Sequence, residues 1–251
     1  METIMELKRE DGCTVRVYPD LGAPNPRSKE YPAGQLGHLL TWGSAAVSPD
    51  ENGYSRPSEL FAELIETHFR FNELHSVLKS EAFDDMRFKT DKLGREHLIV
   101  KDADDWHIDG RYDCAPSLHS LATALADNAK AVALLGQKIA IRPIYFLDGA
   151  YSCKPFGEQE EAPIVGVAYA TPDDVEAFQR NGGIEPWLVE SLLAYEVDEY
   201  STWANKGGFR IEVERPDGSC ESCDGLIAVH CEPEDVLEWS REILPLIDKA
   251  A

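Results

Sequence analysis

Residues 209–218 read FRIEVERPDG, and their pattern indicates the fold class. Apolar and charged side chains alternate from Phe209 to Glu214, which is typical of a strand with one buried and one solvated face. A Pro-Asp-Gly turn follows at 216–218, and an apolar run resumes at 226–229. The pattern predicts a β-hairpin, in which neighbouring strands pair in antiparallel fashion.

The segments on either side of this hairpin extend the same interpretation. Their order lacks the strict strand-helix-strand alternation of a parallel doubly wound sheet. The sequence therefore predicts an α+β fold, with mixed or antiparallel sheets and helices packed against them. Strands are expected over 13–18, 36–42, 138–147 and 164–169, and helices over 58–78, 117–135, 171–181, 186–205 and from 233 onward, while the charged segment 79–113 offers only a short strand at 98–100.

A chain of 251 residues can form one large or two modest domains. We place a boundary between an N-terminal α+β subdomain, 1–137, and an acidic C-terminal α+β subdomain, 138–251. The N-terminal segment lacks the apolar core of a signal peptide, and no run approaches the ~18 apolar residues of a membrane helix. A cytoplasmic protein with reduced cysteines is expected.

Charge is the unusual property of the composition. The formal net charge is -22, and residues 158–251 hold 22 acidic against 6 basic side chains. Such a surface repels nucleic acid and anionic membranes and attracts basic protein surfaces. We therefore expect a basic protein partner and no direct binding of nucleic acid or membrane. The alternative is that the acidity only keeps the protein soluble.

The acidic residues concentrate in one loop and at two expected helices. If their spacing imitates phosphates, this face would occupy the basic groove of a DNA-binding protein. The expected partner-binding residues are Glu158, Glu160 and Glu161 in the loop, Asp173 and Asp174 at the start of one helix, and Glu190, Glu196, Asp198 and Glu199 on the next.

Motifs for catalysis are missing from the sequence. It contains no GxSxG elbow, no P-loop and no GxGxxG phosphate-binding turn, so a non-enzymatic protein without a cofactor is favoured. The alternative is a metal-dependent enzyme or zinc-binding protein, because thiolate and imidazole are the ligands that zinc prefers. Its candidate ligands are Cys220, Cys223, His230 and Cys231, with a second acidic and imidazole cluster over Asp104–Asp109.

Several short stretches also resemble uncharacterised proteins carried by bacteriophages and other mobile elements. They are Asn-Pro-Arg at 25–27, LGHLLTW at 36–42, YFLD at 145–148, SCKPF at 152–156, EVDEYSTW at 196–203, Asp-Gly at 217–218 and SCDG at 222–225. The resemblance spans most of the chain and implies an accessory protein of the kind that often blocks host defence. It implies no reaction and no catalytic residue.

The resemblance to phage and mobile-element proteins and the acidic charge together lead to one functional expectation. The chain is expected to be a phage or mobile-element protein, acting in the host cytoplasm, that binds and inhibits a host nucleic-acid-binding defence protein. A CRISPR effector or a nuclease is the expected partner class, and DNA mimicry is one route to inhibition.

Overall fold

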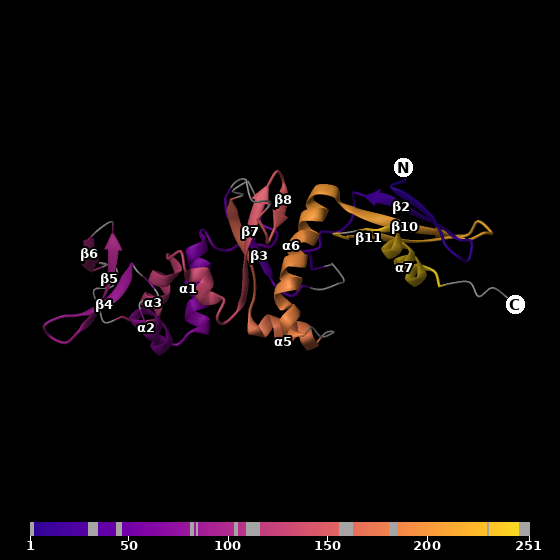
Figure 1. Ribbon diagram of the computed structural model, residues 1–251. Helices are drawn as coiled ribbons and strands as arrows, with labels where there is room; N and C mark the ends of the chain where they lie inside the picture. Colours follow the sequence, from indigo (N-terminus) through magenta and orange to yellow (C-terminus); the bar gives the residue numbers. More distant parts are fainter. Residues whose placement is uncertain are drawn as a thin grey trace. The chain divides into compact units, whose positions relative to one another are not determined.

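The computed structural model describes residues 3–29, 35–43, 47–80, 83, 85–102, 105–108, 116–155, 163–180, 185–229 and 231–245 (Figure 1). The chain forms two compact units. Unit 1 comprises Met1–Asp50, Arg142–Ala168 and Asp173–Ala251, and unit 2 comprises Glu51–Ile141 with Tyr169–Pro172. Helices accompany antiparallel sheets, so the predicted α+β fold is confirmed.

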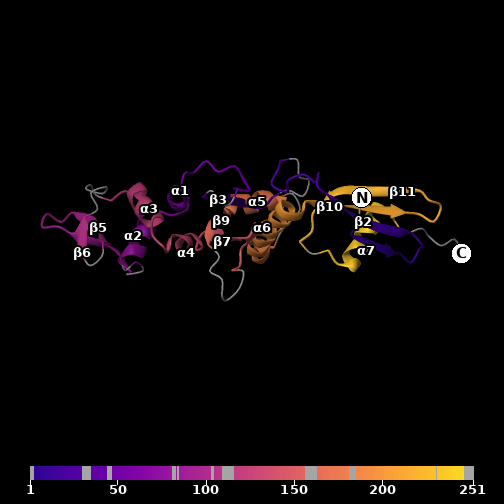
Figure 2. The same cartoon turned by 90° about the horizontal axis from the view of Figure 1, so that it is seen from above.

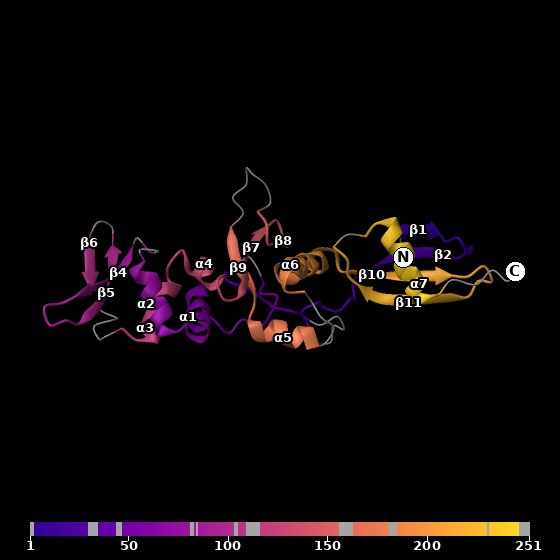
Figure 3. The same cartoon turned by 60° about the horizontal axis from the view of Figure 1, so that its bottom comes forward.

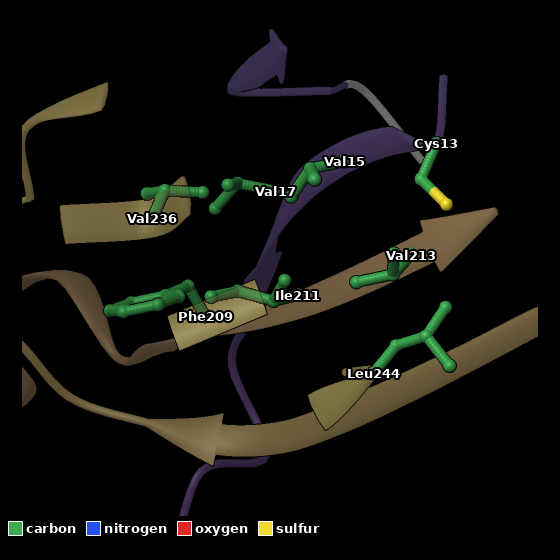
Figure 4. Packing of buried hydrophobic residues seen from close by; sticks show 8 residues of the cluster. All are labelled: Cys13, Val15, Val17, Phe209, Ile211, Val213, Val236 and Leu244. Atoms are coloured by element: carbon green, nitrogen blue, oxygen red, sulfur yellow. The ribbon is translucent and has the colours of Figure 1, made fainter. Parts of the chain in front are cut away.

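The first sheet of unit 1 joins strands from early and late parts of the chain. Its order is β1 (Met5–Lys8), β2 (Thr14–Asp20), β10 (Gly208–Glu214) and β11 (Cys220–Leu226), with every pairing antiparallel. Val17 lies opposite Ile211, and both are at most 1% exposed. Helix α7 (Pro233–Ile243) lies against this sheet (Figure 3) and adds Val236 to the same apolar cluster (Figure 4).

The hairpin predicted from residues 209–218 is present, but its second strand was expected in the wrong place. Strand β11 begins at Cys220, directly after a turn in which the N–H of Arg215 donates to the carbonyl of Ser219 (2.8 Å). The apolar run at 226–229 begins only as β11 ends. A strand at the edge of the sheet does not need an apolar sequence, which is why Cys-Glu-Ser-Cys gave no signal.

The second sheet has the order β3 (His38–Thr41), β9 (Ile164–Ala170), β7 (Ala140–Leu147) and β8 (Ala150–Ser152). The strands predicted over 36–42, 138–147 and 164–169 are thereby confirmed. Helix α6 (Val189–Lys206) packs on β8 and buries Val197 and Tyr200 in a cluster with Ile144 and Tyr151. Before it come α5 (Pro172–Arg180) and a short 3-10 helix, η2 (Pro186–Leu188).

Unit 2 begins with two helices where the sequence predicted one. The helix expected over 58–78 is divided into α1 (Pro57–His68) and α2 (Phe71–Lys79), because the backbone is extended at Phe69 and Arg70. Phe69 is only 4% exposed, so the apolar spacing continues across the break and conceals it. The helix expected over 117–135 is likewise two helices, α3 (Leu118–Ala126) and α4 (Ala131–Leu135).

The charged segment after α2 folds into a three-stranded antiparallel sheet, of which the sequence predicted only one short strand. Its strands are β4 (Met86–Thr90), β5 (Glu96–Asp102) and β6 (Asp105–Ile108), in that order. The sheet lies beside α2 (Figure 2), which contacts β4. At this contact the His75 ring is 4.4 Å from the Phe88 ring, measured between centroids. The remaining positions of the sheet are mostly charged, so only 98–100 showed a strand pattern.

The two units divide the chain differently from the expected subdomains. The boundary expected at 137 and 138 lies near the crossing at 141 and 142, but residues 1–50 group with the C-terminal part. Pairing between β2 and β10 is responsible for this grouping. Composition along the chain carries no information about such distant pairing.

Of the helices in the described ranges, none combines the length and the apolar character needed to cross a membrane.

Candidate functional site

A cavity of about 640 Å³ in unit 1 is lined by α6, β10, β11 and α7. Its apolar lining includes Phe209, Leu226 and Trp239, and the Phe209 and Trp239 rings stack with centroids 5.8 Å apart. Glu199 and Glu242 contribute carboxylates, and no lysine or arginine lines this cavity. An aromatic surface bordered by carboxylates is suited to a cation carried on an aliphatic stem.

The spacing of these residues along each helix places their side chains on the face that lines the cavity. Tyr195 and Glu199 are four residues apart on α6, and Trp239 and Glu242 are three apart on α7, so each pair occupies one helix face. Tyr195 remains 46% exposed. Burial, and secondarily the charge of Glu199, raise the pKa of Tyr195, so its hydroxyl group stays protonated at neutral pH.

A second cavity, of about 450 Å³, shares Tyr195 and Trp239 with the first. It adds Glu190, Asp198 and Asp235 to the acidic lining. It also contains Arg142 and Lys154, and the guanidinium group of Arg142 donates to Glu190 (2.6 Å). We call the two cavities together the acidic groove.

The acidic groove gathers three of the nine residues expected to bind a partner. They are Glu190, Asp198 and Glu199, which all lie on α6. Sequence reasoning missed Asp235 and Glu242 on α7 and Glu221 on β11, which join them only through the tertiary fold. Glu158, Glu160 and Glu161 lie outside the described residues.

The expectation that Glu196 belongs to an outer acidic face is wrong. Glu196 is 6% exposed, and one of its carboxylate oxygens accepts from Arg27 Nη1 (3.0 Å). Burial raises the pKa of Glu196, although Arg27 and two backbone N–H groups oppose this shift. The sequence held a usable signal, because Glu196 lies three residues after Leu193 and four before Tyr200, on the buried side of α6.

Arg27 is the centre of a buried ion network in unit 1. Its side chain is 2% exposed and donates to Asp50 through Nε (2.8 Å) and Nη2 (2.7 Å) as well as to Glu196. The carboxylates also accept backbone N–H groups, from Leu36 (2.5 Å) to Glu196 and from Leu39 (2.7 Å) to Asp50. Residues from three separate stretches of the chain, 25–27, 36–42 and 196–203, therefore meet at a structural ion network.

Asp173 and Asp174, in the first turn of α5, do not line the acidic groove. Asp173 is exposed, whereas Asp174 lies beside His38 at the start of β3, with Oδ1 3.5 Å from Nε2. Hydrogen bonding to Asp174 raises the pKa of His38 above its usual value, against the opposing effect of burial. The carboxylate of Asp174 therefore interacts with a side chain of the same unit.

Replacing Asp174 by asparagine is expected to lower the pKa of His38. Because the folded-state pKa is raised, the pair stabilises the fold fully below the unfolded-state pKa of about 6.5. That contribution is lost as the pH rises through the folded-state pKa. NMR titration of His38 should show the lower pKa in Asp174→Asn, and the variant should be more destabilised at about pH 5.5 than at about pH 8.5. An equal loss of stability at both pH values would contradict the assignment.

Of the proposed zinc ligands, the structure describes Cys220, Cys223 and Cys231, and these three do not form a group that could hold a metal ion. Cys220 and Cys223 are three residues apart on β11, so their side chains leave opposite faces of the strand. Burial, with the charges of Asp235 and Glu232, raises the pKa of Cys231, which disfavours the thiolate. His230 lies outside the described residues.

The second metal hypothesis fares similarly within the described ranges. Asp104 and Asp109 lie outside them, and Asp105 is exposed on β6. Among the residues that the structure describes, no three His, Cys, Asp or Glu side chains are arranged to hold a metal ion. Two further thiols, Cys13 and Cys153, are buried, and burial raises the pKa of Cys153 to about 12.

No family model, no curated protein and no solved structure matches this chain.

Proposed function

We propose that the chain is a non-enzymatic binding protein that holds a basic segment of a partner protein in the acidic groove. The observation that carries this proposal is the placement of Glu199 and Glu242 beside the aromatic surface of Trp239 and Phe209. A lysine or arginine would lay its methylene groups on these rings and direct its charge to the carboxylates. A purely solvating acidic surface needs no such aromatic lining.

The partner proposed is a protein with a basic, nucleic-acid-binding surface. The excess of acid after residue 158 supports this choice, because complementary charge accelerates encounter with such a surface. The resemblance to phage and mobile-element proteins supports a host defence protein, such as a CRISPR effector or a nuclease. Inhibition would follow because the bound chain and DNA compete for the same basic surface.

A defined peptide tests the groove directly. The probe is a synthetic peptide that alternates Lys or Arg with Leu, and its binding is measured by calorimetry at low and high salt. The double variant Glu199→Gln/Glu242→Gln is expected to bind it roughly tenfold more weakly than the parent, a loss of about 1.4 kcal/mol. The affinity of the parent should fall as salt is added.

The matched control removes the same charge from the same region. Glu234 and Glu238 lie exposed on α7 and do not line the groove. Glu234→Gln/Glu238→Gln should change the affinity by less than about twofold, since general steering mainly alters the association rate. Equal losses in both double variants would show that net charge, and not the groove, binds the peptide.

Inhibition is tested on the partner itself, once a host protein has been captured and purified. The parent chain should displace labelled duplex DNA from that protein, and Glu199→Gln/Glu242→Gln should not. A partner that keeps its DNA in the presence of saturating parent chain would contradict the inhibitory role, while the peptide result would still stand.

A further inference from the structure

Unit 2 presents a basic sheet face, although the whole chain is strongly acidic. Residues directly opposite one another in antiparallel strands point to the same face of a sheet. Arg87, Lys89 and Lys101 are exposed on this face, and Trp106 is half-buried beside them. The opposed pairs that define the basic face are Arg87 with Ile99, Lys89 with His97, and Lys101 with Trp106.

Two carboxylates near this face are each bonded to basic side chains, and one of them, Asp91, also lines the cavity on this face beside His97. Glu96 lies on the other face of the sheet, where it bonds to His75 and Lys79, each at 2.8 Å. Asp91, in the turn after β4, accepts from the backbone N–H (2.9 Å) and the side chain (2.8 Å) of Arg95. The hydrogen bond from the Arg95 backbone is the main reason that the pKa of Asp91 lies well below its usual range.

The basic groups of the face, by contrast, are available. Within the described ranges, Arg87, Lys89, Lys92 and Lys101 have no carboxylate partner. Charges act mainly within about 10 Å at 0.1 M salt. The groups that line the face therefore decide what it attracts, and the net charge of the chain does not.

Beside these cations lies a flat stacked pair. The guanidinium carbon of Arg87 is 3.9 Å from the centre of the Trp106 ring. Both residues line a cavity of about 770 Å³, together with Lys89 and Lys92. Planar groups of this kind stack on unpaired bases, and the neighbouring ammonium groups suit phosphates.

We infer that the basic face of unit 2 binds single-stranded nucleic acid. The Arg87–Trp106 pair stacks one base, while Lys89 and Lys92 contact the flanking phosphates. A single strand is favoured over a duplex because the bases of a duplex are stacked on each other and do not offer a free face. The cavity is also of the size that holds a small ligand and not a double helix. This inference does not depend on the acidic groove.

Fluorescence anisotropy with a labelled oligothymidine of about ten nucleotides separates the contribution of base stacking from that of phosphate contacts. Trp106→Ala is expected to weaken binding by roughly 5- to 150-fold, with little change in the salt dependence. Trp106→Phe should retain most of the affinity, which guards against a loss caused by misfolding. Lys89→Gln/Lys92→Gln should reduce the slope of log K against log salt by about 1.4, or about 0.7 for each charge.

Two lysines elsewhere in unit 2 provide the control. Lys130→Gln/Lys138→Gln makes the same charge change away from the basic face and should alter the salt slope by less than about 0.3. The inference is overturned if the oligonucleotide is not bound at about 50 mM salt, or if a duplex of equal length binds more tightly. It is also overturned if Trp106→Ala binds as well as the parent, because the face would then act as a simple polyanion site.

Discussion

Arg27→Ala should lower the free energy of unfolding by about 3–5 kcal/mol, the usual cost of breaking a buried ion pair from one side. The substitution leaves the carboxylates of Asp50 and Glu196, 16% and 7% exposed in their side chains, facing each other without a cation. Urea denaturation followed by tryptophan fluorescence measures the change. The same experiment on Arg180→Ala is the control, because Arg180 pairs with Glu176 on the surface of α5 and is 70% exposed. That loss should stay below about 0.5 kcal/mol.

An apolar replacement of the whole network tests whether its carboxylates are needed as acceptors for backbone N–H groups. Buried ion networks can often be replaced by hydrophobic residues without loss of stability. Here Arg27→Met/Asp50→Leu/Glu196→Leu should remain destabilised, because the carboxylates accept backbone N–H groups from Leu36 and Leu39. Each buried N–H left without an acceptor costs about 1–3 kcal/mol. A triple variant as stable as the parent would contradict the view that Leu36 and Leu39 need these carboxylates as hydrogen-bond acceptors.

The second large effect is expected from adding one methyl group to the second sheet. A Cβ at Gly166 of β9 would lie 2.1 Å from the carbonyl oxygen of Leu40 and 2.9 Å from the Cα of Thr41. Both atoms belong to the backbone of β3, so no side chain can rotate out of the way. Gly166→Ala should therefore cost about 3 kcal/mol or more, the upper range for overpacking, measured as a fall in the urea midpoint.

Gly22→Ala is the matched control in the same unit. Gly22 is exposed, and the nearest atom to its added Cβ would be a side-chain oxygen of Asp20 at 3.4 Å. Alanine also restricts the unfolded chain, so this variant should lie within about 1 kcal/mol of the parent. If Gly166→Ala and Gly22→Ala unfold at the same urea concentration, β3 and β9 are not packed as closely as described.

Periodicity predicted the elements that bury one clear face, such as β10, α6 and α7. It failed where apolar spacing and backbone conformation disagree, as at Phe69, which keeps the helical pattern while the chain is extended. It also failed for β4 and β11, and it found only residues 98–100 of β5, because these strands expose charged or polar positions. Neither failure concerns the chemistry of the residues, and both reflect packing that a local window does not contain.

For the candidate site, the sequence located the acidic helix but not the site that it helps to form. Glu190, Asp198 and Glu199 were expected, whereas Trp239 and Glu242 come from α7, far along the chain. Glu196, by contrast, was wrongly assigned to the binding face, because counting the charged residues of a helix does not show which of them are buried. An acidic residue on the apolar stripe of a helix is better interpreted as half of a buried pair, and a lone arginine in a long loop is a candidate for the other half.

The pairing of β2 with β10 has a consequence for synthesis. The guanidinium group of Arg16 donates to Glu214 across these strands, although the two residues are 198 positions apart. Unit 2 lies between them in the sequence and consists almost entirely of one continuous segment, Glu51–Ile141. During translation, unit 2 can fold while β2 still has one unpaired edge, which β10 satisfies only after residue 214 has left the ribosome. An open edge of this kind invites pairing with other chains. The ion pair between Arg16 of β2 and Glu6 of β1 places charge beside this open edge until β10 pairs with it.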